Sequence, residues 1–239
     1  MVEKRGLIRN KKGVSSIEII ISFVIFLTFL IFIFVYLNPI RSNDKTPILV
    51  SLETGIKQQA MADLIEFPVA VNKSNITSAC FYIRVPQNFE SNISVKSLDD
   101  KNINYTILSG NIYLNNIHDK LYRFIKSDEI KNNETSMNGC QSLDISQYTF
   151  SVERTKQIYS YTKLKQMNDS YYTGYTGLQE KLDFPITSDF SIVIGSDELN
   201  FTMTKNIPSN VQVIVRQFPI EILTSNADKI KAVMTLAVW

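Results

Sequence analysis

The sequence is poor in the residues that most often build enzyme and metal sites. It has one histidine, His118, and two cysteines, Cys80 and Cys140, among 239 residues. A single histidine cannot supply a histidine-based metal cluster, and no convincing Ser-His-Asp arrangement forms around it. The cysteines lie sixty residues apart, without the close pairing of zinc sites, and no Gly-rich phosphate loop is present. We therefore predict no metal site, no cofactor and no catalytic residues, and we do not expect an enzyme.

Net charge is also small, and it is distributed unevenly. Lys and Arg together number 25 and Asp and Glu 23, a formal charge of +2. Residues 1–13 hold five basic side chains and one acidic side chain, a local +4 that leaves about −2 for the remainder. No basic stripe with interleaved aromatic residues follows. Nucleic acid is therefore not expected as a partner.

Residues 14–37 form the longest apolar run, in which Glu18 and Tyr36 are the only ionisable side chains. As a helix, these residues would rise about 36 Å, enough to cross the hydrocarbon layer of a membrane. The basic residues on the N-terminal side of the run place the N-terminus in the cytoplasm by the positive-inside rule. We therefore predict a single-pass membrane protein whose C-terminal domain is extracellular.

The rest of the chain changes pattern twice. Two prolines bracket a polar hinge at residues 38–46, and apolar residues at intervals of three or four then predict an amphipathic helix at 47–66. Short runs rich in Ile, Val, Tyr and Phe, separated by turn residues, predict a sandwich-like antiparallel domain beyond it. The best of these strands are residues 80–85, 103–108, 112–117, 121–126, 190–194, 211–215 and 232–239. The predicted fold class is thus α+β, a long N-terminal hydrophobic helix followed by a β-rich extracellular head. The predicted parts are a leader at 1–13, the hydrophobic helix at 14–37, the hinge and amphipathic helix at 38–66, and the head at 67–239.

The most informative motif stands at the start of the apolar run, where Lys11, Lys12 and Gly13 precede Val14. Ordinary signal peptides are cut after their hydrophobic core, flanked by small residues, and no such site follows residue 37. The motif resembles that of type IV prepilins, particularly archaeal pilins and archaellins with class III signal peptides, which are cut before the hydrophobic segment. The resemblance covers about residues 9–37 and places Ser16 and Glu18 at the third and fifth positions of the mature chain, where glutamate is a hallmark of the family.

The resemblance implies a function in assembly. A prepilin peptidase would cut after Gly13, and Val14 would become the new N-terminus. Glu18 would balance the Val14 amine of a neighbouring subunit within an apolar helix bundle, where an unpaired charge is costly. The chain would then be a major, minor or tip subunit of a pilus-like cell-surface filament, with other pilin subunits and the membrane as its partners.

A different interpretation stays open, that of a membrane-anchored extracellular module that binds sugars, surfaces or another protein without polymerising. In that case Glu18 would lie at the level of the lipid headgroups. A group of tyrosines could form an adhesive or sugar-stacking surface, although such residues also serve in strands and turns. The group comprises Tyr159, Tyr161, Tyr171, Tyr172 and Tyr175.

Two covalent modifications follow from an extracellular location. A disulfide between Cys80 and Cys140 would be chemically permitted, but the sequence alone does not bring the two residues together. Seven Asn-X-Ser/Thr sequons also occur, and chance accounts for about three of them in so Asn-rich a chain. The predicted N-glycosylation sites are Asn72, Asn75, Asn92, Asn104, Asn133, Asn168 and Asn200.

Overall fold

The computed structural model describes residues 16–37, 45–72, 74, 76–86, 89, 91–115, 120–131, 137 and 139–239. The chain divides into two compact units, residues 1–44 and 45–239. We describe each unit by itself. Most of the predicted hinge at 38–46 lies outside the described residues.

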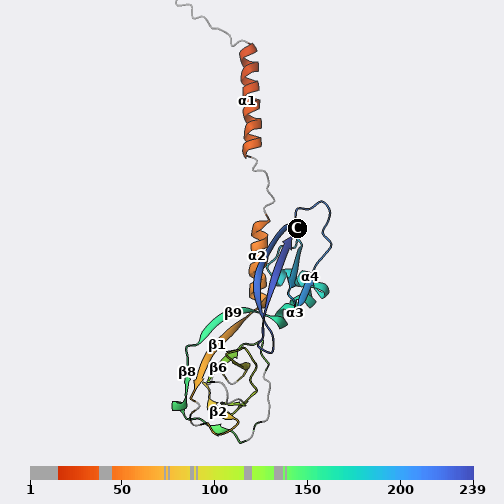
Figure 1. Ribbon diagram of the computed structural model, residues 1–239. Helices are drawn as coiled ribbons and strands as arrows, with labels where there is room; N and C mark the ends of the chain where they lie inside the picture. Colours follow the sequence, from red (N-terminus) through yellow and green to blue (C-terminus); the bar gives the residue numbers. More distant parts are fainter. Residues whose placement is uncertain are drawn as a thin grey trace, which may run out of the picture. The chain divides into compact units, whose positions relative to one another are not determined.

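The described residues of the first unit form a helix, α1 (Ser16–Leu37), drawn in Figure 1 as an unbroken coil. Within the described residues, no helix combines the length and the apolar character that crossing a membrane requires. The predicted transmembrane helix is therefore wrong. The predicted fold class and the single-pass, extracellular localisation fail with it.

The described residues of the second unit are rich in β-structure and include three helices. The helices are α2 (Thr46–Ala60), α3 (Tyr161–Thr173) and α4 (Tyr175–Lys181), and a 3₁₀ turn, η3, spans Ile145–Gln147. The strands are β1 (Met61–Val71), β2 (Phe81–Arg84), β3 (Ile93–Ser97), β4 (Tyr105–Leu108), β5 (Asn111–Leu114), β6 (Leu121–Lys126), β7 (Gln141–Ser142), β8 (Tyr148–Phe150), β9 (Arg154–Ser160), β10 (Phe190–Gly195), β11 (Asn200–Met203), β12 (Ile214–Leu223) and β13 (Lys229–Val238).

The strands form two sheets. The larger has nine strands in the order β11-β10-β13-β12-β9-β1-β6-β3, with β8 also paired to β1, and the smaller has the order β4-β5-β2-β7. Figure 1 shows the larger sheet curling along its length as β1 and β9 lead away from α2. Most pairs are antiparallel, but β12 with β9 and β2 with β7 are parallel. The predicted sandwich-like antiparallel head is therefore replaced by a long curled mixed sheet with a small second sheet.

Two apolar cores fill the second unit. The first lies where α2, α3 and α4 cover one face of β10 to β13, and it contains Leu52, Ile56 and Met234 with no exposed surface. The second lies between β1, β6 and β3 of the large sheet and the small sheet, around Phe81, Phe124 and Tyr122. A smaller cluster that includes Leu64 and Leu223 packs at the middle of the large sheet. The two ends of the curled sheet therefore each have a core.

The predicted helix at 47–66 is correct in its first part only. Pro47 stands at the start of α2, a position where proline is tolerated because the missing N–H has no helical partner there. The helix ends at Ala60, and Met61–Val71 continues as β1, whose buried residues follow an alternating pattern over much of the strand. Alternation is the strand period, and pairing with β9 and β6 holds residues 61–66 in the strand conformation.

Candidate functional site

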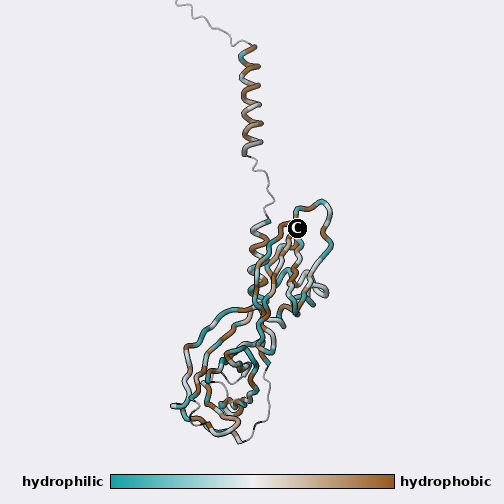
Figure 2. Tube along the Cα trace, in the orientation of Figure 1, coloured by the Kyte–Doolittle hydropathy of each residue, from teal (hydrophilic) through white to brown (hydrophobic). Residues whose placement is uncertain are grey.

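The most unusual surface in the described chain is that of α1. Thirteen large apolar side chains between Ile17 and Phe32 are each at least 36 % exposed. They include the consecutive residues 19–21 and 23–27, so they face every side of the helix. Figure 2 colours most of α1 as hydrophobic. Covering a large apolar side chain contributes about 1.5–3 kcal/mol, so covering this surface would contribute on the order of tens of kcal/mol.

Polar groups on α1 are few, and two of them have clear local roles. The Thr28 hydroxyl donates a 2.8 Å hydrogen bond to the Val24 carbonyl, so it is satisfied within the helix. Glu18 lies in the first turn, where the positive end of the helix dipole favours a carboxylate. The helix therefore presents one acidic group at its start and an apolar surface beyond it.

The predicted processing and assembly residues fall at the edge of the described chain. Lys11, Lys12, Gly13 and Val14 lie outside the described residues. Ser16 is the first residue of α1, and Glu18 follows it in the same turn. The predicted assembly residues thus stand together at the N-terminal end of the apolar helix.

Cys80 and Cys140 form a disulfide whose Cα atoms are 4.7 Å apart. The bridge joins the residue before β2 to the residue before β7. These two strands are parallel neighbours in the small sheet, and the amide of Gln141 donates to the Cys80 carbonyl beside the bridge. The disulfide therefore closes the start of the small sheet.

The sequons are spread over the second unit. Asn72, Asn104 and Asn200 are exposed, whereas Asn92 and Asn168 are half-buried. Asn75 and Asn133 lie outside the described residues. A glycan needs an accessible amide nitrogen, so the exposed sites Asn72, Asn104 and Asn200 are the best described acceptors.

The tyrosine group is mainly part of the first core. Tyr171 donates a 2.6 Å hydrogen bond to the Phe190 carbonyl, and the Tyr175 hydroxyl accepts from the Phe190 amide at 3.2 Å. Burial raises the pKa of both phenols above the usual range. Burial, and then the charge of Glu53, raise the pKa of Tyr159 to about 12. Among the described tyrosines of this group only Tyr172 is largely exposed, so they form no broad adhesive surface.

One important acidic side chain could not be recognised from the sequence. Glu129 is buried, and its carboxylate accepts hydrogen bonds from the Ser160 hydroxyl, from the Thr162 hydroxyl at 2.7 Å and from the Thr162 amide at 3.2 Å. Ser160 is the N-cap of α3. Glu129 therefore fixes the start of α3 from the chain that follows β6.

Among the described residues, no three or more His, Cys, Asp or Glu side chains lie together in a group that could hold a metal ion. His118 lies outside the described residues. No family model, no curated protein and no solved structure matches the chain. Assignment to the type IV pilins thus has no support from these comparisons, and the resemblance continues to rest on the motif around Gly13 and Glu18.

Proposed function

We propose that the chain is a structural subunit that assembles with its own copies, or with similar subunits, through α1 into a pilin-like filament. The observation that carries this proposal is the exposed apolar surface of α1 on all its sides. A helix of this composition is stable in water only when something covers it. Equivalent helices from neighbouring subunits would bury one another in a central bundle.

The N-terminal motif supports the same proposal. A cut after Gly13 by a prepilin peptidase would leave a short segment ahead of α1 and a new amine at Val14. In a helix bundle, the Glu18 carboxylate of one subunit would neutralise that amine on its neighbour. Such a pair would set the stagger between subunits, because two unpaired charges inside an apolar bundle are costly.

A charge placed on α1 tests the proposal. We expect Ile25→Lys to abolish assembly, because a buried ammonium without a partner costs several kcal/mol at each subunit contact. Ile25 is 64 % exposed. Val50→Lys is the matched control, since Val50 is also an exposed aliphatic residue on a helix, α2, of the second unit.

The measurement is negative-stain electron microscopy together with sedimentation of the chain that begins at Val14. The unsubstituted chain and Val50→Lys should both form filaments, and Ile25→Lys should stay dispersed. If Ile25→Lys assembled as well as the unsubstituted chain, α1 would not be the assembly element. A chain that never assembles but retains a binding activity would favour the non-polymerising binding module.

A further inference from the structure

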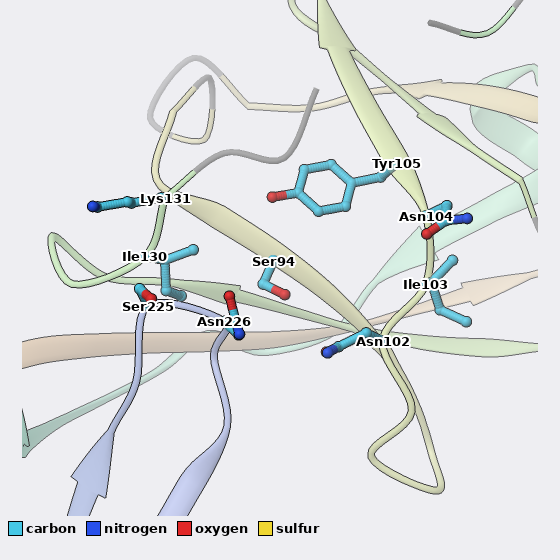
Figure 3. A pocket seen from close by; sticks show the side chains of 9 residues that line it. All are labelled: Ser94, Asn102, Ile103, Asn104, Tyr105, Ile130, Lys131, Ser225 and Asn226. Atoms are coloured by element: carbon cyan, nitrogen blue, oxygen red, sulfur yellow. The ribbon is translucent and has the colours of Figure 1, made fainter. Parts of the chain in front are cut away.

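A cavity of about 190 Å³ lies where four separate segments of the second unit meet. The segments are β3, the chain leading into β4, the chain after β6 and the turn between β12 and β13. The lining residues are Ser94, Asn102, Ile103, Asn104, Tyr105, Ile130, Lys131, Ser225 and Asn226. Figure 3 shows Ser94, Tyr105 and Asn226 around a shared space, with the Lys131 ammonium directed away from it.

The lining has a buried part and an exposed part. Ser94 and Tyr105 are buried, as are the aliphatic side chains of Ile103 and Ile130. The three asparagines of the lining are exposed. A ligand would therefore meet apolar surface and the hydroxyls of Ser94 and Tyr105 inside the cavity, and it would meet amide groups at the rim. The Tyr105 hydroxyl already donates to the Ile93 carbonyl, so it can only accept from a ligand.

Hydrogen bonds and an ion pair hold these segments in place. The Ile103 amide donates to the Val95 carbonyl at 2.9 Å, and the Lys131 amide donates to the Ser225 carbonyl at 3.2 Å. The Lys96 ammonium, buried on β3, pairs with Asp228 at 2.7 Å. The cavity is thus built into the packing between β3 and the β12–β13 turn, and a ligand would not have to order its walls.

The chemistry of the lining indicates the ligand class. No carboxylate lines the cavity, so it lacks the ligands that Ca²⁺ and Mg²⁺ prefer. Its one charged group, Lys131, is directed away from the centre, which disfavours a phosphate. Amides and hydroxyls both donate and accept hydrogen bonds, as sugar hydroxyls do, while Ile103, Ile130 and the Tyr105 ring can contact the apolar face of a sugar ring.

We propose that this cavity binds one neutral sugar ring. Its volume is below the roughly 300 Å³ at which pockets for drug-sized ligands begin, so a single ring is the largest ligand that fits it well. The ring can come from a glycan attached at Asn104, which is both a predicted glycosylation site and a rim residue, or from a separate saccharide. This site is independent of α1 and of filament assembly.

The test uses the full chain, made in a host without N-glycosylation and kept in a detergent without a sugar headgroup. Saturation-transfer NMR is recorded with glucose, galactose and N-acetylglucosamine, and with methyl phosphate, whose methyl protons are observable, as the charged phosphate probe. We expect transfer to at least one sugar and none to phosphate. Asn226→Ala should weaken sugar binding about tenfold, the usual effect of losing one hydrogen bond. Asn200→Ala, an exposed asparagine on β11, is the matched control and should bind as the unsubstituted chain does.

Ser94→Val provides a second variant, because it removes one of the two buried hydroxyls of the lining, and valine favours the strand conformation of β3. Its thermal unfolding is recorded to show that it folds. The proposal is overturned if no sugar gives saturation transfer, if Asn226→Ala and folded Ser94→Val both bind as the unsubstituted chain does, or if phosphate binds in preference to sugar.

A second preparation, glycosylated at Asn104, distinguishes the two sources of the ring. If the attached glycan fills the cavity, the glycosylated chain shows no saturation transfer to free sugar. Asn104→Gln made in the same host lacks that glycan and should show saturation transfer again. If the glycosylated chain still binds free sugar, the ligand is a separate saccharide. Either result supports a sugar site.

Discussion

Gly55→Ala is expected to destabilise the second unit, although alanine is the better helix former. Gly55 lies in α2, and a Cβ built on it would stand 2.2 Å from the Leu182 carbonyl oxygen and 2.9 Å from its carbon. A carbon normally contacts such an oxygen at about 3.2–3.5 Å, so α2 and the chain at Leu182 must separate by about 1 Å. The obstacle is backbone, which cannot rotate aside as a side chain can.

Two opposing effects determine the magnitude. Replacing glycine by alanine within a helix contributes about 0.5–1 kcal/mol of stability. Overpacking a close-packed core costs about 1–3 kcal/mol, and a backbone clash belongs at the upper end of that range. We expect a net loss of about 1–2 kcal/mol in the free energy of unfolding.

Gly177→Ala is the matched control. Gly177 lies in α4, and no atom beyond its chain neighbours and its own helix backbone comes within 4 Å of a Cβ built there. Only the higher helix propensity of alanine should then affect stability, so this substitution should raise the free energy of unfolding by about 0.5–1 kcal/mol. The two glycine-to-alanine substitutions should therefore change stability in opposite directions.

Urea unfolding followed by the fluorescence of Trp239 measures both changes. Trp239 is the only tryptophan and is buried, and its backbone pairs with that of Asp189 ahead of β10. The close approach of α2 to Leu182 would be refuted if Gly55→Ala proved as stable as the unsubstituted chain or more stable.

Four further predictions concern single residues. Cys140→Ser should cost about 4 kcal/mol, the chain-entropy value for a loop of sixty residues, measured by urea unfolding of the oxidised parent and the variant. Glu129→Gln should cost about 1.5–3 kcal/mol, because a charged acceptor of the α3 cap is lost, whereas the same change at exposed Glu198 should cost nothing measurable. Tyr159→Phe should need a higher urea concentration to unfold at pH 7, because the buried hydroxyl has no hydrogen-bond partner among the described residues. Between pH 10 and 12, this variant should also lose less stability than the unsubstituted chain does. The sign follows from the raised pKa: the folded chain holds that proton more tightly than the unfolded chain, so stability is complete below pH 10 and declines as pH rises toward 12. N-terminal sequencing of the chain from its native host should begin at Val14, and a start at Met1 would contradict processing after Gly13.

Local pattern in the sequence was enough to locate several elements. The predicted strand at 121–126 coincides with β6, and the predicted strand at 190–194 is β10 without its last residue. Both are short apolar runs between turn residues, so local sequence largely determines them. The segment 161–181 was not recognised as helical, although Ser160 is a good N-cap and Leu164, Met167 and Tyr171 follow at intervals of three and four.

The parts that were missed depend on contacts between distant residues. Residues 61–66 have a helical apolar pattern when read alone, but pairing with β9 and β6 makes them a strand. The sugar cavity brings Ser94 beside Asn226, 132 positions along the chain, and no local pattern indicates that approach. The membrane prediction treated residues 14–37 as one spanning segment. In the described part of the chain, no helix is long and apolar enough to span a membrane.

The central claim is that α1 is the assembly element and that the second unit folds without it. Sedimentation velocity compares the chain beginning at Val14 with residues 45–239, which form a separate compact unit with two apolar cores. We predict large, filament-sized species for the longer chain and a folded monomer for the shorter one, with the fold checked by circular dichroism. Equal sedimentation behaviour of the two chains, whether both assemble or both stay monomeric, would contradict the claim.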